Sequence, residues 1–168
     1  MRKGRLFLII VAIILLIQLY RPARTNPPSD PAKSIFVTPQ IPVDVAKSLN
    51  HSCSDCHTNN TKWPKYSYIA PVSWLVVDDV NEGRRHVNFS DWGSFSAERQ
   101  QEKLTDICNE VKDGGMPLRQ YTWMHSGTAL NQQQRDAICA WTKSEQQRIA
   151  ARTGVAPPRP KSGGMHAQ

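Results

Sequence analysis

The chain has 168 residues, which suits one domain with short tails, and its 39% hydrophobic and 21% charged residues exclude disordered and fibrous classes. The mean hydropathy of −0.50 excludes a protein with many membrane spans, and four cysteines are too few for a disulfide-dense miniature scaffold. The net charge of +7 comes from the two ends: residues 25–147 hold 12 basic and 14 acidic residues, so we expect no nucleic-acid partner.

Residues 1–20 have the pattern of an export or anchor segment, because three basic residues precede the apolar run LFLIIVAIILLIQLY of residues 6–20. As a helix, this run measures roughly 22 Å against a hydrocarbon core of about 30 Å, and the stems of Arg5 and Arg21 extend it. The residues that follow lack the small side chains that a signal peptidase favours. We therefore expect an uncleaved single-pass anchor in the inner membrane, with the rest of the chain on the periplasmic side.

Proline-rich and glycine-rich segments flank the expected folded body. Residues 21–42 hold six of the twelve prolines and are predicted to form an extended tether. Residues 153–168 combine three prolines with three glycines and basic side chains, which is typical of a disordered tail. The body is then residues 43–152.

The first half of this body is predicted to hold two helices. Residues 43–50 follow a proline and form a short helix that leads into the first cysteine pair. Residues 71–81 form a second helix, which starts at Pro71 and stops at Gly83. Residues 84–86 are then expected to belong to a polar loop.

Two further helices follow in the second half. The third has Ser96 as N-cap and ends at Gly114. Its apolar stripe has helical spacing and consists of Leu104, Ile107, Cys108 and Val111. The last helix starts at Asn131, with Gln134 completing a capping box. Its inner stripe consists of Ala137, Ile138, Trp141 and Ile149. No alternating strand pattern is visible, so the fold class is predicted to be all-α.

The chemistry-bearing motif is CSDCH at residues 53–57. The spacing CxxCH is the attachment signature of c-type haem, since two thiols one helical turn apart reach the two vinyl groups of the porphyrin. Cys53 and Cys56 would then form the thioethers, and His57 would be the proximal iron ligand. Covalent attachment takes place outside the cytoplasm, which agrees with the export pattern.

A CxxC pair also occurs in two other kinds of site, thiol-redox sites and zinc sites. A thiol-redox pair favours a thioredoxin-like βαβ context, which this chain lacks. A zinc site favours a second CxxC or an HxxxH pair, whereas Cys108 and Cys139 each stand alone. We therefore expect one covalent haem c per chain and keep a haem-free thiol or zinc protein as the alternative.

Met116 is the best candidate for the distal iron ligand, because it follows two glycines at a helix end and precedes Pro117. A methionine that only fills the core is the other interpretation. The rivals are Met124, His125 and His86, which we expect to serve packing or solvation. The basic pair at residues 84–85 is expected either to bind haem propionates or to be solvated.

Cys108 and Cys139 remain once the motif has used its own pair. Each lies beside an isoleucine on a predicted helix, which is typical of buried thiols. In an oxidising compartment, they would instead form a disulfide between the third and last helices. The sequence leaves both alternatives open.

Several separated blocks resemble the bacterial haem-binding domain family with a single CxxCH: CSDCHTNNTKWPKYSYIAPVSW, DVNEGRRHVNFSDW, GGMPLRQYTWMH and AICAW. The resemblance covers residues 43–142 and implies a cytochrome c-like helical fold around one haem. It implies thioethers at Cys53 and Cys56, with His57 proximal and Met116 distal. It also implies pocket or packing roles for Trp63, Pro64, Tyr66, Pro71, Trp74, Asn88, Tyr121 and His125.

The function expected from these features is a membrane-tethered periplasmic one-electron carrier with no substrate chemistry of its own, whose partners are other redox proteins. A haem-based sensor or a peroxidase-like domain is the alternative, and it requires a displaceable sixth ligand.

Overall fold

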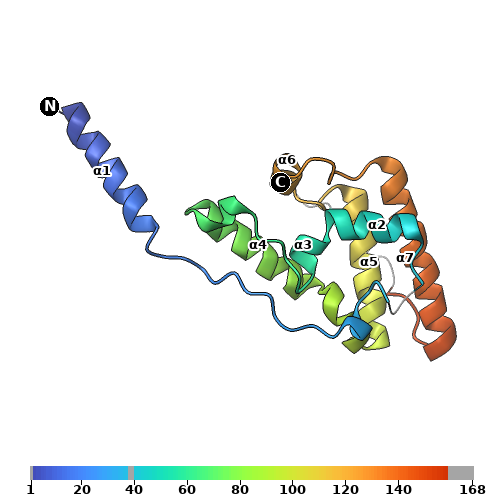
Figure 1. Ribbon diagram of the computed structural model, residues 1–168. Helices are drawn as coiled ribbons and strands as arrows, with labels where there is room; N and C mark the ends of the chain where they lie inside the picture. The colour runs from blue at the N-terminus through green and yellow to red at the C-terminus, as the bar shows by residue number, and fades with distance from the viewer. Residues whose placement is uncertain (1, 38–39, 159–168) are drawn as a thin grey trace. The chain divides into compact units, whose positions relative to one another are not determined.

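The computed structural model describes residues 2–37 and 40–158, and these residues form helices without any strand (Figure 1). The α-helices are α1 (Arg2–Ile17), α2 (Val43–Ser52), α3 (Ser54–His57), α4 (Val72–His86), α5 (Ala97–Asp113), α6 (Arg119–Met124) and α7 (Gln132–Thr153). The short 3-10 helices are η1 (Pro31–Lys33), η2 (Lys65–Tyr68) and η3 (Phe89–Ser94). The predicted all-α fold class is confirmed.

The chain divides into two compact units, each built from two segments. Unit 1 consists of residues 1–29 and 54–90, and unit 2 consists of residues 30–53 and 91–168. In unit 1, α4 packs against α3 and η2. In unit 2, α7 packs along α5 and also contacts α2.

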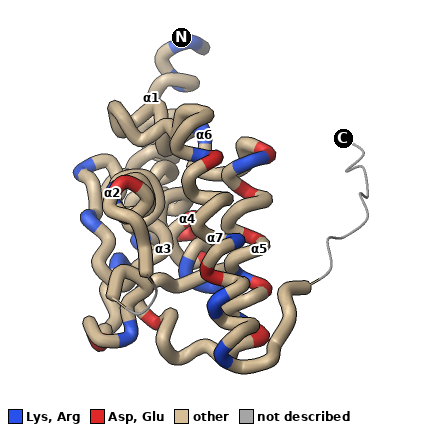
Figure 2. Tube along the Cα trace, turned by 90° about the vertical axis from the view of Figure 1, so that its right-hand side faces the viewer, with Lys and Arg blue, Asp and Glu red and all other residues tan. Residues whose placement is uncertain are grey.

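Side chains of the predicted apolar stripes of α5 and α7 pack into the core of unit 2. Leu104 and Ile138 are fully buried, and Val111, Trp141 and Ile149 nearly so. Figure 2 shows acidic and basic residues interspersed along the same two helices.

The predicted helix ends of α5 and α7 are confirmed. The Ser96 side chain accepts a hydrogen bond from the Arg99 N–H, and Gly114 ends α5 in the left-handed conformation with φ of 77°. At the start of α7, the side chains and backbones of Asn131 and Gln134 form both bonds of the capping box. These caps satisfy N–H groups that the first turn of a helix leaves without partners.

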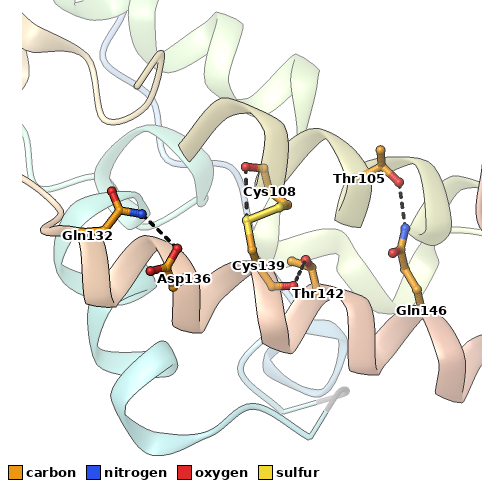
Figure 3. Close-up of a disulfide and its surroundings, with 7 residues drawn as sticks. All are labelled: Thr105, Cys108, Gln132, Asp136, Cys139, Thr142 and Gln146. Atoms are coloured by element: carbon orange, nitrogen blue, oxygen red, sulfur yellow. Dashed lines mark hydrogen bonds between the residues drawn. A yellow bond between two sulfur atoms is a disulfide. The ribbon is translucent and has the colours of Figure 1, made fainter. Parts of the chain in front are cut away.

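A disulfide joins Cys108 of α5 to Cys139 of α7, with a sulfur–sulfur distance of 2.01 Å (Figure 3). Of the two alternatives for this pair, the structure contains the disulfide and not two thiols. About two turns further along, the Gln146 side chain donates to Thr105 Oγ1 at 2.7 Å and ties the same two helices together (Figure 3).

Two expectations concern residues 1–42. Within the described part of the chain, no helix has the length and apolarity that crossing a membrane requires. The predicted single-pass anchor therefore finds no support, because α1 ends at Ile17 and the next side chain, Gln18, bonds the backbone of Ala70 instead.

The predicted tether of residues 21–42 is not free chain in its described part. Asn26 donates to the carbonyl oxygen of Thr61 within unit 1, and Ile35 is fully buried within unit 2. Asp30 caps η1 through its side chain. The prolines suppress regular structure here, but they do not prevent packing. The predicted tail of residues 153–168 lies outside the described residues from residue 159 onward.

Helix α4 also differs from its prediction, since it continues through Gly83 to His86. The glycine does not end the helix but allows a close approach: a Cβ at this position would lie 2.7 Å from the Cys56 carbonyl oxygen. Consequently the residues expected in a polar loop, 84–86, form the last turn of α4.

Candidate haem site

The CxxCH motif lies where α2 ends and α3 begins. Cys53 is the C-cap of α2 and donates its N–H to the Leu49 carbonyl at 3.0 Å. Cys56 and His57 lie on α3, whose four residues form little more than one turn. Both cysteines of the motif are half-buried, and neither forms a disulfide.

Two threonine hydroxyl groups donate hydrogen bonds to carbonyl groups of α3 that have no donor within so short a helix. Thr58 Oγ1 donates to the Ser54 carbonyl, and Thr61 Oγ1 donates to the Asp55 carbonyl, both at 2.7 Å. These bonds explain how a four-residue helix persists.

The His57 ring is held from its Nδ1 side. Nδ1 lies 3.0 Å from the carbonyl oxygen of Val87, the residue that ends α4. A carbonyl oxygen can only accept, so Nδ1 carries the proton and the lone pair of the neutral ring lies on Nε2. The ring also stacks on Phe89, with centroids 5.5 Å apart and planes 27° apart.

Burial lowers the pKa of His57, against the opposing effect of its backbone hydrogen bonds. The imidazole is therefore neutral at physiological pH. A neutral imidazole with Nδ1–H on a carbonyl is the form that binds metal through Nε2.

Burial also raises the pKa of the Cys56 thiol to about 12, helped by the negative charges of Asp79 and Asp55. A thiol-redox cysteine depends on a lowered pKa, because the thiolate is the nucleophile. The environment of Cys56 therefore disfavours the haem-free thiol alternative.

A buried amide network joins the segment after α3 to the segment after α4. Asn88 donates to the side-chain oxygen of Asn59 at 2.8 Å, and the Asn59 N–H donates to Ser90 Oγ at 3.0 Å. Asn88 also accepts from the Ser90 N–H. This network keeps Val87 and Phe89 beside the His57 ring, and nothing in the sequence pattern predicts it.

The expected solvation of Arg84 is wrong, because its guanidinium is bound by neighbouring groups of unit 1. Its guanidinium donates four hydrogen bonds of 2.8–3.0 Å within unit 1, to Thr58 O, Thr25 O, Asn26 Oδ1 and Thr61 Oγ1. Arg85 forms an exposed ion pair with Glu82, and His86 Nε2 lies 3.6 Å from the same carboxylate.

Met116 lies in unit 2, in the loop between α5 and α6. It is half-buried, and its N–H donates to the Glu110 carbonyl at 3.1 Å, which folds the loop back over the end of α5. The left-handed Gly114 allows this reversal.

Two of the rival distal ligands, Met124 and His125, lie on or directly after α6, a helix that the sequence pattern does not predict, whereas the third, His86, is the last residue of α4. The His125 ring stacks on Tyr121 at 4.2 Å, and its Nδ1 lies 3.1 Å from the Tyr121 carbonyl oxygen. Met124 and its neighbour Trp123 are exposed, so the Met124 side chain does not have the expected packing role among the described residues.

Other residues of the resemblance have structural positions in unit 1. Pro64 precedes η2, which contains Tyr66, and Pro71 precedes α4. Trp74 donates its indole N–H to the Tyr20 carbonyl, whereas the indole N–H of Trp63 is buried without an acceptor.

Comparison with known proteins supports haem binding. The profile of the family described as "Haem-binding domain" matches residues 12–144. The chain belongs to this haem-binding domain family. No curated protein and no solved structure matches the chain significantly.

The residues of the motif fit a covalently attached haem. The chain offers two cysteines outside any disulfide, with two residues between them, followed at once by a histidine whose Nδ1 is held by a carbonyl. A zinc ion would instead need further ligands, and no group of three or more His, Cys, Asp or Glu suited to a metal ion occurs among residues 2–37 and 40–158.

Proposed function

We propose that this haem-binding protein is a mono-haem c-type cytochrome that carries single electrons outside the cytoplasm. The observation that carries the proposal is the position of His57: it directly follows the CxxC pair, and its Nδ1 lies 3.0 Å from the Val87 carbonyl oxygen. When bound, the haem supplies one-electron redox chemistry.

Each residue of the motif has a defined task in this proposal. The side chains of Cys53 and Cys56 hold the haem through thioethers, and His57 Nε2 binds the iron. The Val87 carbonyl fixes the tautomer and orientation of the imidazole, while Phe89 restricts rotation of the ring.

Met116 is proposed as the distal ligand. Its support is the glycine-flanked loop, in which the backbone of Met116 is tied to Glu110 while the side chain is only half-buried. A thioether ligand raises the reduction potential, and a filled sixth position disfavours substrate or gas binding. The protein therefore acts on other redox proteins rather than on a small substrate.

The proposed location is the outer side of the inner membrane. Three basic residues precede the uncharged apolar side chains of α1, which is the pattern of an exported chain. Protease added outside spheroplasts should digest the protein, and membrane fractions should contain it. Digestion only after lysis of the spheroplasts would contradict this location.

Covalent haem attachment tests the main proposal. The full chain is expressed with a cytochrome c maturation system, then denatured and extracted with acidic organic solvent. Haem should stay with the polypeptide and be lost in the Cys53→Ala/Cys56→Ala variant. The matched control, Cys108→Ala/Cys139→Ala, also lacks two cysteines and should keep its haem. Loss of haem from the unchanged chain, beside a control cytochrome that matures, would overturn the proposal.

A pair of methionine variants tests the distal ligand. Met116→Ala should abolish the methionine–iron charge-transfer band of the oxidised protein and lower the reduction potential. Met124→Ala, which changes an exposed methionine, should alter neither. If the unchanged protein lacks that band and binds carbon monoxide readily, the sixth position is open. The sensor or peroxidase-like alternative then replaces the carrier.

A further inference from the structure

Unit 1 exposes a group of large apolar side chains at the end of η2 and in the first turns of α4. These side chains, the η2–α4 face, are Tyr68 (49% exposed), Ile69 (61%), Val72 (42%) and Leu75 (66%). Single exposed apolar residues are ordinary, but four within eight positions form a patch that typically contacts something apolar.

The η2–α4 face lies beside the end of α1. Gln18 donates to the Ala70 carbonyl at 3.1 Å and accepts from the Ala70 N–H at 3.0 Å. Trp74 donates to the Tyr20 carbonyl at 3.0 Å, and the two rings meet edge to face at 6.0 Å. Figure 1 shows the start of α4 close to the end of α1. The residues that directly follow α1 therefore contact the segment that carries the η2–α4 face.

The segments that flank this face in sequence are basic, while acidic residues lie one turn further along α4, at Asp78 and Asp79, and beside Lys62, whose N–H donates to Asp55. Residues 18–29 and 61–76 contain four basic residues and no acidic residue. Those basic residues are Arg21, Arg24, Lys62 and Lys65. The Arg24 guanidinium lies 3.9 Å from the centre of the Tyr68 ring, which places a positive charge directly beside the η2–α4 face.

This composition matches the regions of an anionic bilayer: apolar residues suit the acyl chains, and the tyrosine, tryptophan and basic side chains at their edge suit the headgroups. Aromatic side chains favour the headgroup level, and basic side chains are attracted by anionic lipids. A protein partner would not explain why the face lies beside the end of α1, which has no charged residue between positions 6 and 17. Surface docking buries apolar groups only about 5–10 Å deep, so it needs no spanning helix.

We propose that unit 1 docks on an anionic lipid surface through the η2–α4 face, with α1 inserted beside it. Ile69, Val72 and Leu75 enter the acyl boundary, while Tyr20 and Trp74 lie at headgroup level. This inference rests on the proposed location at a membrane, and it adds that the folded part itself contacts the lipid.

Site-specific accessibility tests the docking. The full haem-loaded chain carries either Leu75→Cys or, as a matched control, Val43→Cys, which replaces an apolar residue of unit 2 that is 71% exposed. Each variant is treated with a charged, membrane-impermeant maleimide, with and without vesicles of phosphatidylcholine and phosphatidylglycerol. Peptide mass spectrometry then separates the new cysteine from Cys53 and Cys56.

Docking predicts that vesicles slow modification at Leu75→Cys about tenfold or more, and at Val43→Cys less than twofold. Omitting phosphatidylglycerol should weaken vesicle binding roughly fivefold for each basic residue that contacts the surface. Equal protection at the two positions on co-sedimented vesicles would overturn the proposal. Protection at Leu75→Cys before vesicles are added would also overturn it, because the haem or another protein surface then covers the face.

Covalent haem is measured in the same samples. A chain without haem that still shows the vesicle-dependent protection would overturn the proposed cytochrome function and keep the docking surface. A haem-loaded chain without that protection would do the reverse.

Discussion

Replacing Gly83 with alanine should weaken the structure around the haem motif. A Cβ at this position would lie 2.7 Å from the carbonyl oxygen of Cys56 and 3.1 Å from its carbonyl carbon and its Cβ. Real Cβ atoms do not approach backbone oxygen so closely, and a backbone carbonyl cannot rotate away as a side chain would. Helix α4 must therefore shift away from α3.

The magnitude follows from two opposing effects. Overpacking of this kind costs about 1–3 kcal/mol, while glycine to alanine inside a helix contributes about 1 kcal/mol of stability. Gly83→Ala should therefore lose up to about 2 kcal/mol in the free energy of unfolding, and should be about 1–3 kcal/mol less stable than a glycine-to-alanine change that meets no close contact. The shift also moves Val87 relative to His57, so the yield of covalent haem should fall.

Urea unfolding of the haem-loaded protein measures the first effect, and the absorbance of bound haem per chain measures the second. The matched control is Gly4→Ala in α1, where an added Cβ meets nothing within 4 Å. That variant should be neutral or slightly more stable. A Gly83→Ala protein as stable as the Gly4→Ala protein would refute the reasoning about the close approach.

Three further predictions concern single features. The Cys108→Ala/Cys139→Ala variant should lose about 3–4 kcal/mol of stability, since the cross-link closes a loop with a sequence separation of 31; a loss below about 1 kcal/mol in urea unfolding would contradict this. Arg84→Lys should lose about 2–3 kcal/mol, because one ammonium group cannot replace a guanidinium that donates four hydrogen bonds; unchanged thermal unfolding would count against it. In protein made without haem, alkylation of Cys56 should reach half its maximal rate near pH 12 rather than near pH 9. The free energy of unfolding should fall as the pH rises from about 9 to about 12, because the unfolded chain releases the thiol proton first. An alkylation midpoint below pH 9 would revive the thiol-redox interpretation.

The sequence predicted the features that depend on nearby residues. The caps at Ser96 and Asn131 and the stripe of Leu104 and Val111 follow from local spacing, and the structure contains them as expected. The CxxCH motif is equally local, so its three residues could be named without a structure.

Features that depend on distant neighbours could not be predicted. Gly83 looked like a helix stop, because nothing in the chain nearby indicates that the Cys56 backbone lies against it. Helix α6 has six residues and no side-chain cap, and its aromatic sequence shows no helical period. The Val87 carbonyl that holds His57 is a backbone group, and such a contact leaves no trace in residue identity.

The cysteine arrangement has a consequence for how the protein is made. Four cysteines allow three ways of pairing all of them, and the structure joins Cys108 to Cys139 while Cys53 and Cys56 form no disulfide. Under the proposed function, Cys53 and Cys56 would have to meet the porphyrin as thiols, so a Cys53–Cys56 bond or an exchange with Cys108 would block maturation. Assembly would then require a reductant that acts on the CxxCH pair but spares the cross-link between α5 and α7.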